Sequence, residues 1–244
     1  MIGQALRAHV RTFAGDIVLL WVVVAAFAVS LSLATSIPPE LAEAPADVRT
    51  ALTAAFTAVL ATYGAVLASV YGSFRYTLDR RDGVVAQRLM LQPRWVTLLV
   101  RAPASALGGA VVALAGLAGG HAALAFAIGG IALDGTAVGS TLALGAIAGL
   151  WGMGLGIVVQ AHLVALFAAS LSMGAGLLVA ILWKAGAVYL PLLAMLKALR
   201  FDVAAVGIMP GESLDGSTAV LVTAGWVTAA LLAGWLSFMN RDVR

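Results

Sequence analysis

One stretch of 49 residues, from Gly135 to Trp183, contains no charged side chain, and it constrains the fold more than any other feature. A single helix of that length would measure about 73 Å at 1.5 Å per residue, more than twice the roughly 30 Å hydrocarbon core of a bilayer. The stretch must therefore fold back on itself. Its polar residues Gln160 and His162 predict a tight turn between two spans, at about 138–159 and 163–183.

The other uncharged runs divide the remaining chain in the same way. The runs 17–39, 50–74 and 216–240 each fit one span of about 20 residues, and they predict spans at about 17–37, 51–74 and 218–239. The run 102–133 is too long for one crossing and too short for two. We interpret it as one span, 102–120, followed by an apolar segment from His121 to Asp134 that lies at the interface or dips into the membrane.

Composition agrees with this division. Apolar residues make up 62% of the chain and charged residues 10%, whereas a soluble domain has about 45–50% and about 25%. The predicted fold class is all-α: one polytopic integral membrane domain, residues 1–244, with six transmembrane helices and an N-terminal amphipathic interfacial helix. That helix is expected over residues 2–13, where Arg7 and Arg11 lie off the apolar face. A plain cytoplasmic flank there, or a cleavable signal peptide within residues 1–44, is the alternative.

Basic residues set the orientation, because cytoplasmic loops carry an excess of Lys and Arg. With the N-terminus inside, ten basic residues are cytoplasmic and four are outside. The inside set is Arg7, Arg11, Arg75, Arg80, Arg81, Arg88, Arg94, Arg101, Arg241 and Arg244, and the outside set is Arg49, Lys184, Lys197 and Arg200. We therefore expect a multi-pass protein of the cell membrane, in contact with lipid, with both termini cytoplasmic. A net charge of +3 predicts no nucleic-acid partner.

The segment 75–101 carries most of the predicted inside charge. Asp79 or Asp82 is expected to cap a short helix, Val85 and Leu89 to form its apolar side, and Pro93 to end it. Such a helix is either a docking surface or a solvated loop that only sets the topology. The candidate docking residues are Asp79, Arg80, Arg81, Asp82, Gly83, Arg88, Pro93 and Arg94.

Two other segments carry structural expectations. The glycines Gly145, Gly149, Gly152 and Gly156 recur along one face of the span 138–159 and predict close helix packing. The outer segment 184–217 is expected to form short interfacial helices, interrupted near Pro191 and at Pro210-Gly211, that act as an outer gate or only cap the bundle.

The missing chemistry narrows the function. The central levels of the spans hold no ionisable residue, which disfavours a secondary transporter, and no phosphate-binding loop is present. Asp79 to Ala86 matches the opening D-x-x-D-G-x-x-A of the CDP-alcohol phosphatidyltransferases. Gln87 replaces the next Arg of that motif, and no acidic residue follows Asp82 before Asp134. Two carboxylates are too few for the metal pair of that family, so we predict no metal, no cofactor and no catalytic residue on this chain.

The arrangement as a whole resembles the type-2 permease family, the membrane subunits of ABC-type exporters. The resemblance rests on the amphipathic segment 2–13, six spans, the charged loop 75–101 and the long outer segment. Locally, the stretch from Gly83 to Pro93-Arg94, the basic Arg101 at the start of a span and the tail Asn240 to Val243 are similar to family patterns. The acidic residue usual at the end of span two is absent, and Phe74-Arg75 stands there.

This resemblance implies a transport subunit and not an enzyme. ATP and Mg²⁺ would bind a separate ATP-binding subunit that docks on the charged loop, and a second permease chain, identical or different, would complete the pathway. The apolar spans favour an amphiphilic cargo such as a drug, lipid or peptide. A structural or regulatory membrane subunit without a pathway of its own is the alternative from another class.

Overall fold

The computed structural model of the chain describes residues 15–32, 43–129, 135–208 and 213–240, and the regular elements within these ranges are all helices. They are α2 (Ile17–Ser32), α3 (Ala46–Arg81), α4 (Val84–Leu91), α5 (Arg94–Ile128), α6 (Gly135–Val159), α7 (His162–Leu182), α8 (Lys184–Ala187), α9 (Pro191–Ala198), the 3-10 helix η3 (Val203–Val206) and α10 (Gly216–Asn240). The predicted amphipathic helix over residues 2–13 lies outside the described residues.

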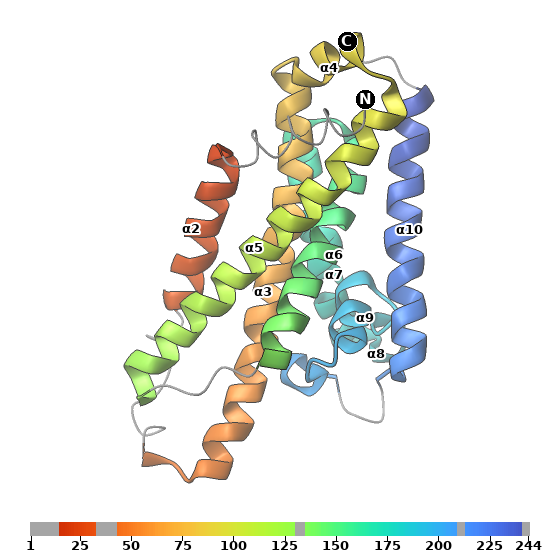
Figure 1. Cartoon of the computed structure of the whole chain (residues 1–244). Helices are drawn as coiled ribbons and strands as arrows, with labels where there is room; N and C mark the ends of the chain where they lie inside the picture. The colour runs from red at the N-terminus through yellow and green to blue at the C-terminus, as the bar shows by residue number, and fades with distance from the viewer. Residues whose placement is uncertain (1–14, 33–42, 130–134, 209–212, 241–244) are drawn as a thin grey trace.

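The long helices run up and down in an antiparallel bundle (Figure 1). We call one end of this bundle the α4 end, because α4 lies there together with the first residue of α2 and the last residue of α10. The opposite end, where α8 and α9 lie, is called the α9 end. The helix α6 is central, since it packs along α3, α5 and α10.

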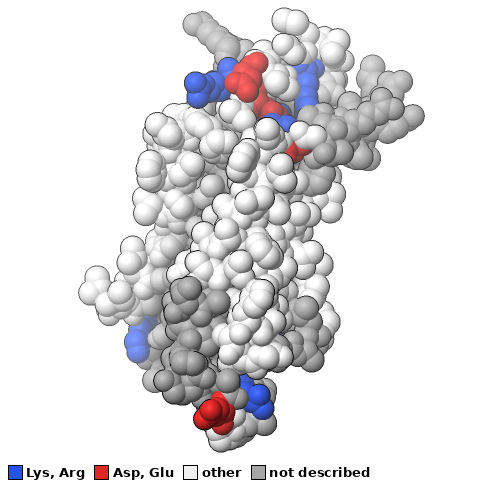
Figure 2. Space-filling model, turned by 90° about the vertical axis from the view of Figure 1, so that its left-hand side faces the viewer, with Lys and Arg blue, Asp and Glu red and all other residues white. Residues whose placement is uncertain are grey.

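Within the described residues, five helices are long and apolar enough to cross a membrane: α3 from Ala51 onward, α5, α6, α7 and α10. The helix α2, at the first predicted span, is apolar but has only 16 described residues. On the face shown in Figure 2, charged side chains lie at the two ends of the molecule and leave an uncharged belt between them. The chain is therefore a helical protein with the features of a multi-pass membrane protein.

The helix that contains the predicted span 102–120 continues past residue 120 into the segment that we expected at the interface or dipping into the membrane. The helix α5 runs without interruption from Arg94 to Ile128, and Gly129 ends it with a φ of 81°. Residues 121–128 stay helical because Ala123 and Leu124 continue the buried face, and the His121 side chain bonds to the carbonyl of Leu117. With 35 residues, α5 is about 52 Å long, so it extends beyond a bilayer core of about 30 Å.

The predicted loop 75–101 is also mostly helical. Residues 75–81 are the last turns of α3, and residues 94–101 are the first turns of α5. Only α4 and its short connections stand between these long helices. Charged residues do not end these helices, because helices of 36 and 35 residues continue past the apolar core.

The turn between α6 and α7 lies at Gln160, near the midpoint of the uncharged 49-residue stretch. Gln160 adopts a φ of 62°, and α6 ends at Val159 while α7 begins at His162. The His162 ring packs against Phe74 at 4.3 Å between centroids, and its Nδ1 lies 2.8 Å from the Thr77 hydroxyl. The same hydroxyl lies within hydrogen-bond distance of the carbonyls of Ser73 and Phe74 of α3.

The glycines of α6 lie at its closest contacts with neighbouring helices. A Cβ at any of the four would meet a backbone oxygen of α3 or α5. Gly145 and Gly149 face Gly109 and Ser105 of α5, whereas Gly152 and Gly156 face Ser69 and Ser73 of α3. Small residues permit such backbone contact in lipid, where the hydrophobic effect does not drive helices together.

The outer segment does not lie flat on the bundle. Pro191 begins α9, at a position where proline is well tolerated, and residues 192–196 are at most 2% exposed. The helix α9 packs against α10, α7 and α3 and lies buried among them at the α9 end. The turn before it is held by the indole N–H of Trp226, which donates to the Tyr189 carbonyl at 2.7 Å. We expected interfacial helices, so the burial of α9 corrects that expectation.

Candidate functional site: a buried ion-pair network

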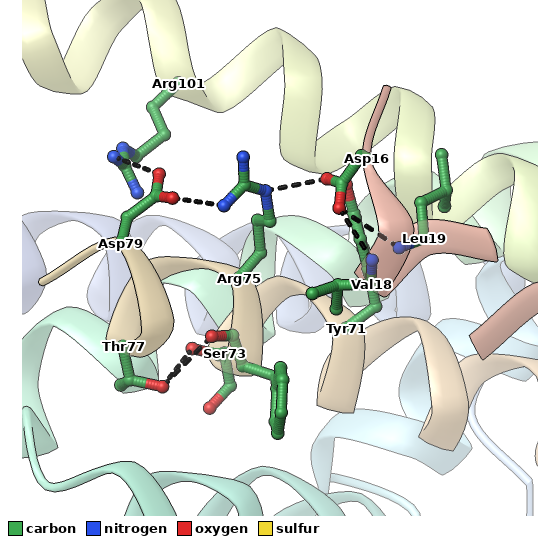
Figure 3. A network of polar contacts seen from close by, with 10 residues as sticks. Asp16, Val18, Leu19, Tyr71, Ser73, Arg75, Thr77, Asp79 and Arg101 are labelled. Atoms are coloured by element: carbon green, nitrogen blue, oxygen red, sulfur yellow. Dashed lines mark hydrogen bonds and ion pairs between the residues drawn. The ribbon is translucent and has the colours of Figure 1, made fainter. Parts of the chain in front are cut away.

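A chain of alternating charges crosses the α4 end of the bundle (Figure 3). Arg101 of α5 donates from Nη2 to Oδ2 of Asp79 at 2.6 Å, and Arg75 of α3 binds the other oxygen of Asp79. The Nε of Arg75 in turn lies 2.7 Å from Oδ2 of Asp16, just before α2. The network therefore ties three helices together through four side chains.

Asp16 holds the start of α2. Its Oδ1 accepts the backbone N–H groups of Val18 and Leu19 at 3.0 and 3.2 Å, as an N-cap does. Its Oδ2 also accepts the hydroxyl of Tyr71 at 3.2 Å. The Tyr71 ring fits against Gly108 of α5, where a Cβ would collide with it. The sequence thus places a small residue where α5 must admit this tyrosine.

Burial makes these pairs interdependent. Asp79 and Arg101 are 4% and 3% exposed, and removal of one partner from such a pair leaves an uncompensated charge in a medium of low polarity. The network occupies the last two turns of α3 and the first two of α5, so it lies near the end of the bundle and not at its middle. A proton or ion pathway through the bilayer centre would need ionisable groups deeper in the helices.

The short helix α4 covers this network. Its Val85 is fully buried against an apolar cluster that includes Tyr76, Leu98 and Phe238. Burial lowers the pKa of Arg88, and the positive charge of Arg101 lowers that pKa further. Movement of α4 would therefore change both the apolar cluster and the electrostatic field at Arg101.

The candidate docking residues fall into two groups. Arg81, Asp82 and Pro93 are exposed, whereas Arg80, Gly83, Arg88 and Arg94 are half-buried and Asp79 is buried. Arg94 donates to the carbonyls of Phe238 and Met239, so it fixes the end of α10. Asp79 is occupied by its two arginines.

Our expectation that Asp79 or Asp82 caps α4 is wrong. Gly83 occupies the N-cap position with a φ of 73°, and no side chain caps the helix. Because L-residues rarely adopt this backbone conformation, glycine is favoured there.

Sequence reasoning did not find several residues of this site. The four-residue spacing of Arg75 and Asp79 could have revealed their pairing on one face of a helix. No local signal links Asp16 or Arg101 to them, because each lies on a different helix. Met90 and Leu91, each 86% exposed at the end of α4, were read only as part of the charged loop.

In the described part of the chain, no cluster of three or more His, Asp or Glu side chains is placed to hold a metal ion. Asp79, the first carboxylate of the partial phosphatidyltransferase motif, is bound by Arg75 and Arg101. This arrangement weighs against metal binding by Asp79. No protein-family model matches the sequence, and no curated protein shows significant similarity to it.

Proposed function

We propose that this chain is the permease subunit of an ATP-driven ABC exporter of the type-2 class, in the cell membrane with both termini cytoplasmic. The α4 end would then face the cytoplasm. Six of the described basic residues lie there, Arg75, Arg80, Arg81, Arg88, Arg94 and Arg101. This distribution follows the positive-inside rule.

The observation that carries the proposal is the position of α4. It is a separate helix of eight residues between the two longest helices, and its buried Val85 fixes it to the bundle. Its far end presents Met90 and Leu91 to the surroundings, each 86% exposed. A helix that is anchored on one side and open on the other can pass a push from a soluble subunit to α3 and α5.

In this mechanism, a separate ATP-binding subunit carries ATP and Mg²⁺, and a second permease chain, identical or different, completes the pathway. ATP-driven closure of the soluble subunits moves α4, and the glycine-packed helices α3, α5 and α6 transmit the movement as a rigid unit. At the opposite end, the helix α9 moves and opens the pathway. The apolar surfaces around α9 favour an amphiphilic cargo such as a drug, lipid or peptide.

The test is co-purification of the tagged full-length chain from its native membranes, followed by mass spectrometry and an ATPase assay. We expect a protein with a phosphate-binding loop to accompany the chain. The double substitution Met90→Asp with Leu91→Asp should remove it, because two carboxylates would replace the apolar contact. Lys184→Glu, an exposed charge reversal at the α9 end, should leave the association intact.

Absence of any such ATPase from the wild-type complex would contradict the proposal and favour a structural or regulatory subunit. Ion-gradient-driven uptake by the chain alone in vesicles would instead support a secondary transporter. Undiminished association in the Met90/Leu91 variant would remove α4 as the docking helix.

A further inference from the structure

In the ion-pair network, the arginines have more N–H donors than the carboxylates accept. Arg101 uses Nη2 for Asp79, but its Nε and Nη1 are buried and have no partner in the described part of the chain. An arginine carries five N–H donors, and buried donors are nearly always satisfied in folded proteins. Arg101 is only 3% exposed, so bulk water does not satisfy these atoms.

Two neighbouring groups show the same deficit. The guanidinium of Arg101 lies 5.3 Å from the centroid of the Tyr76 ring, and Tyr76 is 1% exposed. The Tyr76 hydroxyl and Nη1 of Arg80 form no hydrogen bond of normal length and angle within the described ranges, although the Arg80 side chain is placed to donate to that hydroxyl. Tyr76 and Arg80 are four residues apart and so lie on one face of α3, within electrostatic reach of each other.

The carboxylates of the network do not bind these remaining donors in the structure. Both oxygens of Asp79 are bound by arginines. Asp16 accepts from Arg75, from Tyr71 and from the backbone of α2. The unused donors of Arg80, Arg101 and Tyr76 therefore lack an acceptor within the network, and donors from neighbouring arginine and tyrosine side chains suit an oxyanion with several oxygens.

The level of the cluster in the bundle indicates where such an oxyanion comes from. The uncharged stretch 50–74 of α3 ends one residue before Arg75, so the cluster begins where the apolar length ends. Trp95 lies within two turns of Arg101 on α5 and is 45% exposed, and tryptophan is typical of the membrane–water interface. Arg80 and Arg88 are half-buried, so the cluster reaches the surface through them. Basic pockets at this level bind lipid headgroups.

We propose that Arg101, Arg80 and Tyr76 form a binding site for a phosphate group, supplied by the headgroup of an anionic phospholipid at the α4 end. Bound there, the phosphate accepts from the four unpartnered donor atoms and adds negative charge beside Arg101. It links α3 to α5 directly under α4. The site does not depend on the identity of a transport partner.

The experiment measures thermal unfolding of the purified full-length chain in neutral detergent. The added probes are dioctanoyl phosphatidylglycerol, dioctanoyl phosphatidylcholine and inorganic phosphate. We expect the phosphatidylglycerol to raise the unfolding midpoint in a saturable way and the zwitterionic lipid to have a much smaller effect. An equal rise with inorganic phosphate would support the oxyanion site and assign it to free phosphate instead of lipid.

The variant Tyr76→Phe with Arg80→Gln removes unpartnered donors and leaves the Asp79 to Arg101 pair in place. Its apparent Kd for the lipid should be weaker by about tenfold or more, from the loss of hydrogen bonds to a charged group. Arg81→Gln, an exposed arginine next to the cluster, is the matched control and should bind as the wild type does. If no anion shifts the unfolding midpoint, or if the Tyr76/Arg80 variant responds as the wild type does, the proposed phosphate site is refuted.

Discussion

At the scale of single residues, Asp79 is the centre of the ion-pair network at the α4 end. It is the only side chain in the described network that binds two arginines, one on its own helix and one on α5. Arg101 is buried, and Asp79 is the carboxylate that neutralises its charge. From the sequence we expected Asp79 on a docking surface, since a one-dimensional pattern cannot distinguish a charge that faces water from one that faces another helix.

Asp79→Asn should destabilise the protein by about 3–5 kcal/mol, the cost of leaving one charge of a buried pair uncompensated. Reversible unfolding of the purified chain, by heat or denaturant, measures this change. Asp82→Asn, at the exposed C-cap of α3, should change stability by less than about 0.5 kcal/mol. Replacement of the pair by Asp79→Leu with Arg101→Met should recover much of the loss, and equal loss in both variants would contradict the argument.

Asp215 lies just before α10, and its contribution to the stability of the protein depends on pH. Hydrogen bonds from the Ser217 hydroxyl and then from Thr218 hold the pKa of Asp215 below its ordinary value. A depressed folded-state pKa contributes stability above the unfolded pKa of about 3.9, and this stability is lost as the pH falls through the folded pKa. Asp215→Asn should therefore differ from the wild type most above pH of about 4, and thermal unfolding curves of the two should converge in stronger acid.

At the scale of elements, the helices pack through glycines whose positions decide the effect of a methyl group. Gly152→Ala should destabilise the protein by about 1–3 kcal/mol, because the added Cβ meets the backbone oxygen of Ser69. Gly139→Ala, in the same helix with no atom of the described residues within 4 Å of the added Cβ, should be neutral or stabilise by up to about 1 kcal/mol through helix propensity. Unfolding of the two variants in detergent tests the pair, and an equal effect would refute α6 as the packing centre.

Much of this element-level structure was predictable from the charges alone. Long uncharged stretches fixed the positions of α3, α6, α7 and α10, and Gln160 marked a turn. The ends of α3 and α5 were not predictable, because their charged turns satisfy one another across the bundle. The burial of α9 was equally hidden: its apolar residues suit a membrane interface and a packed core alike, and only tertiary contacts decide between them.

At the scale of the whole molecule, the two ends of the bundle are built differently, and the closely packed helices α3, α5 and α6 form a rigid middle between them. The α4 end holds an ion-pair network beneath a small helix, whereas the α9 end holds the buried helix α9. Between them, α3, α5 and α6 are in backbone contact, and this contact leaves little room for bending. A displacement at one end would therefore reach the other as a movement of whole helices, and α9 has to move if the proposed pathway is to open.

A disulfide that fixes α9 tests this coupling, and the absence of cysteine from the chain makes the experiment clean. A Cβ at Gly176 of α7 would lie 3.5 Å from the Cβ of Leu190, just before α9, within the range that a disulfide requires. Oxidised Gly176→Cys with Leu190→Cys should lose cargo-stimulated ATPase activity of the complex, and a reductant should restore it. Gly64→Cys with Ala113→Cys, also 3.5 Å apart, locks α3 to α5 within the rigid middle and should retain activity. If the disulfide at α9 leaves the cargo-stimulated ATPase activity intact while the disulfide between α3 and α5 abolishes it, the moving part is the middle of the bundle and not α9.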